Sequence, residues 1–378
     1  MGKRRGNSEG TIYFHEPKQL WCTQVSLGLV DGKRRRKMIY GKTRREVAEK
    51  LKVLLREQQL GQVVATNRQT TAQLLERWLT HVKPTVRPRT YDSYLSTVHR
   101  HLVPTIGAIH LGKLTSNDIA ALLNRKEEEG LSPRTRQYIR AILRMALNYA
   151  VDENLIGRNV VLKAPKPRVE RHEVRVLSLD EARRLLDAAK GDRFEALYTV
   201  ALGLGLRQGE ALGLRWDDVD FTEGTLHVRR SLQRIEHKLQ LVQPKTDNSR
   251  RTIAMPNETI LALREHRRRQ LEEQVAAVVW EDHQLVFTTS KGTPLEKSGL
   301  TKRFRKLLEV AGLPPMRFHD LRHSCASILL AQGVPMNVVQ RVLGHSSISV
   351  TVDIYGHLLP TAKQEAAAIM DAILTGRR

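Results

Sequence analysis

The first part of the chain alternates apolar and polar positions. Residues 10–41 follow this period of two, with interruptions at Pro17 and at an Asp-Gly pair. Successive side chains of a strand point to opposite faces, and Asp-Gly favours a tight turn, so the pattern predicts three short strands with a hairpin. Thr43, with Glu46 three residues later, is typical of a helix start. We therefore expect a small sheet followed by one helix that ends near residue 62.

From Thr70 onward the apolar positions recur every three or four residues. Amphipathic stretches occupy residues 70–82, 88–102, 115–129 and 132–154. This period predicts four helices. The last stretch opens with Ser132 and Pro133, residue types that favour the N-cap and the first helical position. Residues 159–174 contain two prolines and mixed charge and predict an extended linker.

The C-terminal part mixes helical and strand patterns. Residues 178–190 open with a second capping pair, Ser178 and Glu181, and residues 193–216 are largely helical in pattern. Residues 224–256 alternate like strands and turn at 245–249. The expected fold class is α+β: a three-stranded sheet with a helix, a four-helix domain, and a mainly helical domain with a small sheet. The expected domains are residues 1–62, 66–158 and 175–378, with the linker at 159–174.

The net charge of the chain indicates the kind of partner that it binds. The 378 residues include 63 Lys and Arg against 40 Asp and Glu, a formal charge of +23. Such an excess attracts polyanions, above all nucleic acid. No apolar run reaches the roughly 18 residues of a membrane-spanning helix, and the basic N-terminus is not followed by the apolar stretch of a secretory signal. With only two Cys, we expect a cytoplasmic protein that has no membrane partner.

One stretch, residues 318–333, concentrates polar groups in a helical pattern. His319 and His323 share a helix face, as the two ligands of a zinc hydrolase would, with Asp320 in place of the usual Glu. Arg322 would repel that cation. His319 and Arg322 also share a face, and together they suit a phosphoryl group. The structural alternative is that Arg322 pairs with Asp320 or another acid, and that His319 is a core residue.

Further polar residues occur at intervals along the C-terminal part. Arg207 follows a Gly-broken apolar segment and has Glu210 three residues later, Lys245 lies at the expected hairpin tip, and His345 precedes Tyr355 by ten residues. Each has an ordinary reading when taken alone: a buried ion pair, a solubilising lysine, a packed aromatic. These individual interpretations change when the residues are considered together, in their order along the chain.

The motifs GLGLRQGEALGLRW, PKTDNSRRTI, HDLRHSCAS and LGHSSISVTVDIYGH stand in the order seen in the tyrosine recombinase (phage integrase) family, which residues 175–360 resemble. The resemblance implies that Arg207 and Arg322 hold a scissile DNA phosphate, with Glu210 supporting the first. It also implies that Lys245, His319 and His345 complete the pocket and that Tyr355 is the nucleophile. The N-terminal parts resemble the family's arm-binding and core-binding domains.

The resemblance also implies a reaction and its partners. It implies a site-specific recombinase or integrase of a phage or other mobile element that forms a 3′-phosphotyrosine and needs neither metal, ATP nor other cofactor. The implied partners are double-stranded attachment-site DNA, three further copies in a synaptic homotetramer, and an accessory bending or directionality protein, in a bacterial cytoplasm at the nucleoid. A relaxing topoisomerase of type IB and a non-catalytic DNA-binding regulator remain as alternatives. A basic run at the N-terminal sheet is either a solvated surface charge run or a set of side chains that contact DNA phosphates: Lys33, Arg34, Arg35, Arg36 and Lys37.

Overall fold

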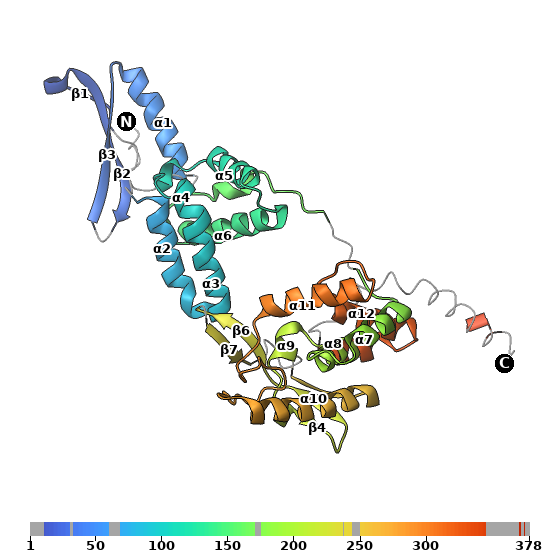
Figure 1. Cartoon of the computed structure of the whole chain (residues 1–378). Coiled ribbons are helices and arrows are strands. Elements are labelled where there is room, and N and C mark those ends of the chain that lie inside the picture. Colours follow the sequence, from blue (N-terminus) through green and yellow to red (C-terminus); the bar gives the residue numbers. More distant parts are fainter. Residues whose placement is uncertain are drawn as a thin grey trace. The chain divides into compact units, whose positions relative to one another are not determined.

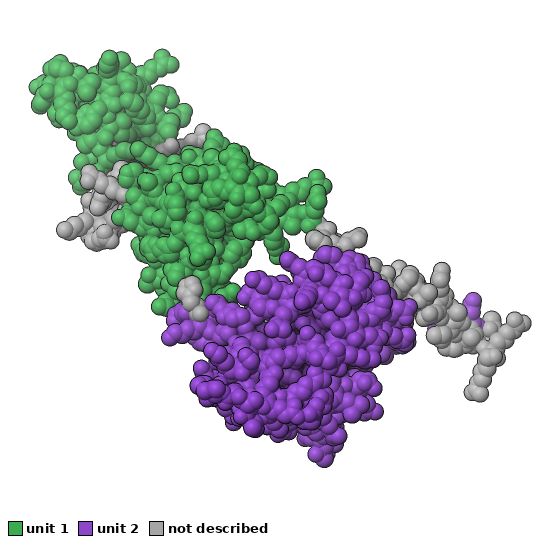
Figure 2. Space-filling view, viewed as in Figure 1, with its two compact units in different colours: residues 1–171 green, residues 172–378 purple. Residues whose placement is uncertain are grey.

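The structure, a computed structural model, describes residues 11–30, 33–59, 69–170, 175–236, 238–243, 250–344, 370–371 and 374. The chain divides into two compact units, residues 1–171 and residues 172–378 (Figure 2). This division lies inside the segment that we expected to be a linker. No helix in the described part of the chain has both the length and the apolar character to cross a bilayer.

The N-terminal sheet has the three antiparallel strands that the alternating pattern predicts. They run in the order β1-β2-β3 and are followed by one helix (Figure 1): β1 Tyr13–His15, β2 Leu20–Val30, β3 Lys33–Gly41 and α1 Arg44–Gln59. Helix α1 packs on β2 and β3, and a small core forms where Val25 and Ile39 meet Val47 and Leu54. The second strand is longer than expected, because its pairing with β3 continues past a register shift between Ser26 and Leu29.

The middle of the chain is helical, as the periodicity predicts. Its helices are α2 Thr71–Val82, α3 Pro88–Thr97, α4 Val103–Ile106, α5 Ser116–Glu128 and α6 Pro133–Asp152. A single π-helical turn, Val98–Leu102, joins α3 to α4, so the second predicted helix continues beyond its expected end. Ser132 caps α6 by accepting a hydrogen bond from the Thr135 N–H, and Pro133 occupies the first helical position. The apolar faces of these helices meet in one core.

The predicted linker is shorter than expected, because its first residues pack on α6. Val160–Lys163 form a 3₁₀ turn, and Val161 is fully buried. Arg140 of α6 donates hydrogen bonds to the carbonyls of Val161 and Ala164, at 2.8 and 3.1 Å. Apolar burial and these bonds outweigh the extended tendency of a Pro-rich segment. Gln137 of α6 also donates to the Pro167 carbonyl at 2.6 Å, so contacts with this helix extend to Pro167.

The second unit contains seven helices among its described residues, together with two small antiparallel sheets. The helices are α7 Leu179–Ala189, α8 Glu195–Gly203, α9 Gln208–Leu212, α10 Asn257–Ala276, α11 Lys297–Val310, α12 Asp320–Ala331 and α13 Met336–Leu343. The strands are β4 Val219–Asp220, β5 Thr225–Val228, β6 Ser231–Ile235, β7 Lys238–Val242 and β8 Arg251–Ala254, in one sheet of order β4-β5-β8 and one hairpin β6-β7. The reciprocal Ser178–Glu181 cap of α7 is present as predicted. Helix α8 lies in the middle of the helices, in contact with α7, α9, α10 and α12.

Residues 193–216 are not one helix, because glycine positions break and redirect the chain. Gly205 has a φ of 60°, a left-handed conformation that ends the helical path between α8 and α9. A Cβ on Gly209 would lie 2.6 Å from the Ser231 Oγ, and a Cβ on Gly213 would lie 2.8 Å from the Leu232 N. Both glycines therefore allow α9 to approach the backbone of β6 closely. This approach fixes the helix that carries Glu210.

The chain is anchored to α12 where it enters the second unit. The N–H of Leu177 donates to the Ser324 Oγ at 2.9 Å, and the Ser324 hydroxyl donates to the Asp320 carbonyl at 2.9 Å. Leu177 and Ser324 are both buried. The start of the unit is thus bonded to the helix that bears Arg322.

Candidate active site

Arg207 and Glu210 form a reciprocal pair at the start of α9. The Arg207 N–H donates to Glu210 Oε2 at 3.0 Å, and Arg207 Nη1 donates to Oε1 at 2.7 Å. Arg207 Nη2 also donates to the carbonyl of Gly344, at the end of α13, at 3.1 Å. Its side chain is 37 % exposed, whereas that of Glu210 is 4 % exposed. The buried carboxylate of Glu210 therefore orients the Arg207 guanidinium, part of which remains exposed to solvent.

Arg322 lies on the first turn of α12 and is almost fully buried. Its Nη1 donates to the carbonyl of Gly205 at 2.7 Å, which connects α12 to the break before Arg207. The left-handed turn at Gly205 presents this carbonyl. Arg322 is thus held by a carbonyl two residues before Arg207, although the two arginines are 115 residues apart in the sequence.

His319 is brought to the same place, at the N-terminus of α12. Partial burial, and then the charges of His323 and Arg322, lower its pKa toward a value of about 4, and Arg207 acts in the same direction. The His319 residue is nonetheless exposed to solvent, and water screens these charges, so we expect its pKa to lie between this value and its ordinary one of 6.5. A ring with a lowered pKa is neutral at pH 7. It can then accept a proton and does not add another positive charge.

Asp320 is not the partner of Arg322. Its buried carboxylate accepts hydrogen bonds from the N–H of Arg317 at 2.8 Å and from the Arg317 guanidinium at 2.8 Å. The sequence alternative that paired Asp320 with Arg322 is therefore wrong. The zinc interpretation loses its general base for the same reason, and no group of three His, Cys, Asp or Glu side chains among the described residues is placed to hold a metal ion.

Arg251 is the residue of this cluster that the sequence analysis missed. It lies on β8, its side chain is 7 % exposed, and its Nη2 donates to Glu210 Oε2 at 3.0 Å. Burial alone would raise the pKa of Glu210, but Arg251 and Arg207 outweigh it and hold this pKa below the ordinary value. The sequence contains a signal for this position. Arg251 and the apolar Ile253 are two residues apart in a predicted strand, so both side chains lie on the same face, and the structure shows that Ile253 is buried there.

The remaining candidate residues are only partly within the described structure. Lys245, His345 and Tyr355 lie outside the described residues, so their positions relative to the arginines stay predictions. The basic run of Lys33, Arg34, Arg35, Arg36 and Lys37 lies on β3. The side chains of Arg36 and Lys37 are described, and both residues are exposed.

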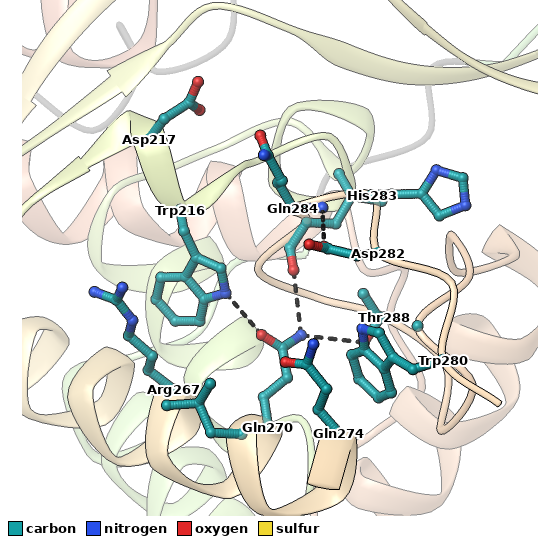
Figure 3. Close-up of a pocket in the computed structure, with 13 residues that line it drawn as sticks. Trp216, Asp217, Arg267, Gln270, Gln274, Trp280, Asp282, His283, Gln284 and Thr288 are labelled. Carbon is teal, nitrogen blue, oxygen red and sulfur yellow. Dashed lines mark hydrogen bonds between the residues drawn. The ribbon is translucent and has the colours of Figure 1, made fainter. Parts of the chain in front are cut away.

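A separate cleft of about 430 Å³ lies beside α10 and contains none of the predicted site residues. Figure 3 shows Gln270 at its centre, where its Oε1 accepts a hydrogen bond from the indole N–H of Trp216 at 2.7 Å. The Gln270 Nε2 donates to the Val286 carbonyl at 3.0 Å and to the Thr288 Oγ1 at 3.1 Å. The amide group is satisfied by the protein itself, so we interpret Gln270 as a structural bridge.

Comparisons with known proteins identify the family of this chain. The model of the phage integrase family matches residues 175–361, and that of the phage integrase N-terminal SAM-like domain matches residues 70–126. A protein of Caldanaerobacter subterraneus subsp. tengcongensis named tyrosine recombinase XerC-like is 33 % identical over 384 residues, covering 96 % of this chain and 98 % of that protein. The ICEBs1 integrase of Bacillus subtilis is 27 % identical over 93 % of this chain and 96 % of its own length.

Solved structures share the fold. The Tn1549 transposon integrase in complex with a circular intermediate DNA aligns with a TM-score of 0.67 at 21 % identity, over 81 % of this chain and 99 % of that one. A lambda integrase dimer bound to a COC′ core site aligns with a TM-score of 0.58 at 20 % identity, over 75 % of this chain and 95 % of that one. The α+β fold class that the sequence predicts is confirmed. From its sequence relatives and family models, the chain belongs to the phage integrase family of tyrosine recombinases, enzymes that transfer DNA strands.

Proposed function

We propose that this chain is an integrase that cuts and rejoins duplex DNA at specific sites through a 3′-phosphotyrosine at Tyr355. The observation that carries the proposal is the pair of preset guanidinium groups. Glu210 and the Gly344 carbonyl fix Arg207, and the Gly205 carbonyl fixes Arg322. Each guanidinium is already oriented by acceptors of the protein itself, which supports a role in binding an anion.

The two arginines suit the charge of a DNA phosphate during strand cleavage. Attack by an oxygen nucleophile increases the negative charge on the non-bridging oxygens of the phosphodiester. Guanidinium forks that are already oriented stabilise that charge at little further cost. Because these fixed cations supply the charge that a metal ion would supply, we expect cleavage to proceed in EDTA.

In this proposal, His319 and Lys245 carry out the proton transfers. A tyrosine phenol has an ordinary pKa of about 10, so Tyr355 needs a base, and neutral His319 is a suitable acceptor. In this scheme Lys245 gives a proton to the leaving 5′-oxygen, and His345 donates a hydrogen bond to a non-bridging oxygen. The phosphotyrosine conserves the energy of the broken bond, so a 5′-hydroxyl from a second duplex can reverse the step without ATP.

The basic N-terminal unit would supply most of the non-specific grip on DNA. Residues 1–66 contain 15 Lys and Arg against 6 Asp and Glu, and residues 67–170 contain 17 against 9. We propose that residues 1–62 and 66–158 are separate DNA-binding domains, the first of which reads a second site through the sheet that carries Lys33 to Lys37. A lambda integrase tetramer has been solved on a Holliday junction. We propose that this chain likewise acts as a tetramer, with an accessory bending protein, in the cytoplasm of a bacterial cell where the chromosome lies.

The test is covalent trapping on a nicked duplex that carries the attachment junction of the element encoding the chain. The full chain should become joined to the 3′ end of the cut strand, and Tyr355→Phe should abolish the adduct. Tyr198→Phe is the matched control, because Tyr198 is a buried tyrosine of the same unit. An adduct that persists in Tyr355→Phe would contradict the assigned nucleophile.

The same preparation separates the two alternatives. A topoisomerase of type IB would relax a supercoiled plasmid that lacks the junction, whereas an integrase requires the junction. A regulator without catalysis would bind the junction and form no adduct with any variant.

A further inference from the structure

Arg251 connects three segments of the second unit through its side chain. Its Nη2 donates to Glu210 Oε2 at 3.0 Å, and its Nε donates to the carbonyl of Val342 at 2.6 Å. Glu210 belongs to α9, Val342 to α13 and Arg251 to β8. The side chain is 7 % exposed, so it bridges these segments from inside the unit.

Each of the three segments either contacts a residue of the proposed catalytic site or lies close to one in the sequence. Glu210 holds Arg207. Val342 is two residues before Gly344, whose carbonyl also accepts a hydrogen bond from Arg207. Strand β8 begins six residues after Lys245 in the sequence. A change at Arg251 therefore reaches Arg207 by two routes and also affects the strand that follows the lysine.

The electrostatics of the cluster depend on Arg251. Glu210 is buried, and its carboxylate faces two guanidinium groups, that of Arg207 from the start of α9 and that of Arg251 from β8. Elements β6 and α8 also contact α9. The β6 atoms closest to α9 belong to Ser231 and Leu232, which carry no charge, and α8 carries its only charged residue, Glu195, at its far end. Without Arg251 the carboxylate would keep one guanidinium partner, and its protonated form would become easier to reach.

We propose that Arg251 is a positioning residue for strand cleavage: it acts on the scissile phosphate through Glu210 and the end of α13, without touching the DNA. The inference rests on the proposed strand-transfer function and adds a residue to its machinery. Two properties of the side chain are required. Its charge keeps Glu210 ionised, and its planar guanidinium donates hydrogen bonds to two acceptors on different segments, the Glu210 carboxylate and the Val342 carbonyl.

The experiment compares variants of the full chain on the nicked junction duplex. It measures the dissociation constant for DNA and the single-turnover rate of adduct formation between pH 5 and 9. Arg251→Met should lower the rate about 100-fold, the size of effect that a misplacement of about 1 Å produces at a reacting centre. Its DNA affinity should stay within about threefold of the wild type, since the residue does not touch DNA. The acid limb of its pH–rate profile should move to higher pH, because Glu210 then holds its proton more tightly.

Two further variants separate positioning from a general loss of stability. Arg251→Lys retains the charge but cannot reach both acceptors with one planar fork, so it should restore the acid limb while the rate stays low. Arg193→Met is the matched control, because Arg193 also joins a glutamate, Glu273, to a backbone carbonyl, that of Thr288, but away from the cluster. It should cleave at the wild-type rate with an unshifted profile.

Three outcomes would overturn the inference. The first is a wild-type rate in Arg251→Met. The second is a reduced rate with an unshifted acid limb in every Arg251 variant that near-ultraviolet circular dichroism shows to be folded, which would mean a merely structural role. The third is a wild type that forms no adduct, which would refute the proposed function and this inference together. In the first two outcomes the wild-type adduct still forms, so the proposed function survives them.

Discussion

Gly205→Ala tests whether the turn before Arg207 is a fixed support for Arg322. A Cβ at this position would lie 2.6 Å from Leu343 Cδ2 and 3.2 Å from Cys325 Sγ, and the residue has a φ of 60°. Leu343 is fully buried and Cys325 is 4 % exposed, so neither side chain has room to withdraw. The left-handed conformation costs an L-residue roughly 1–2 kcal/mol. Overpacking adds about 1–3 kcal/mol. The expected loss is therefore about 2–5 kcal/mol.

Gly333→Ala is the matched control for the backbone contribution. Gly333 has a φ of 79°, and no atom lies within 4 Å of a Cβ built there. This substitution should lose only the conformational part, roughly 1–2 kcal/mol. The difference between the two variants isolates the contact with Leu343 and Cys325.

Hydrogen exchange of the α12 amides is a suitable assay, because it reports local stability in a chain of two units, for which a single unfolding transition is not assured. Adduct formation should also fall in Gly205→Ala, since the Gly205 carbonyl accepts the hydrogen bond from Arg322 Nη1. Equal exchange protection in the two variants, with equal cleavage rates, would refute the reasoning. It would mean that Leu343 and Cys325 can move away from the added methyl group without a loss of stability.

Three further predictions concern the cleft, the buried carboxylate and the sheet. Gln270→Leu removes the acceptor of the Trp216 indole N–H and should lower the local stability around α10 by about 1–3 kcal/mol; hydrogen exchange of the α10 amides checks this, and unchanged protection would contradict it. The pKa of Glu210 in the folded chain lies below its ordinary value of 4.5, so its ionised form stabilises the fold at neutral pH, and this contribution is lost as the pH falls below about 4.5. Glu210→Gln should accordingly be less stable than the wild type at pH 7, and the gap should close in acid. Replacing Arg36 and Lys37 by Gln should reduce the log–log salt slope of DNA binding by about 1–2, since each neutralised phosphate contributes roughly 0.9; an unchanged slope would mean that these two exposed residues do not contact phosphates.

The sequence predicts what depends on neighbours along the chain. The Ser178–Glu181 and Arg207–Glu210 pairs each span three residues, and the residue types alone indicate them. Amphipathic period likewise predicts the helices of the middle segment. Thr43 caps α1 as expected, but the Glu46 side chain accepts from the N–H of Lys42, one residue before the expected donor.

What the sequence could not predict depends on contacts between distant segments. Arg251 and Glu210 are 41 residues apart, and nothing local indicates that their side chains meet. The anchoring of Val161 to Arg140 overrides a Pro-rich pattern through burial. Asp320 had two basic candidates nearby, and only the folded chain shows that it takes Arg317. Choices of this kind are made by tertiary packing and not by periodicity.

The bond between Leu177 and Ser324 has a mechanical consequence. Tension along the preceding chain would be shared between the ion pair of Arg175 with Glu181, at 2.6 Å, and this buried bond, and Ser324 lies two residues from Arg322. A pull on that chain would therefore act on α7 and also on the helix that orients the guanidinium of Arg322, at the turn where Ser324 bonds the Asp320 carbonyl.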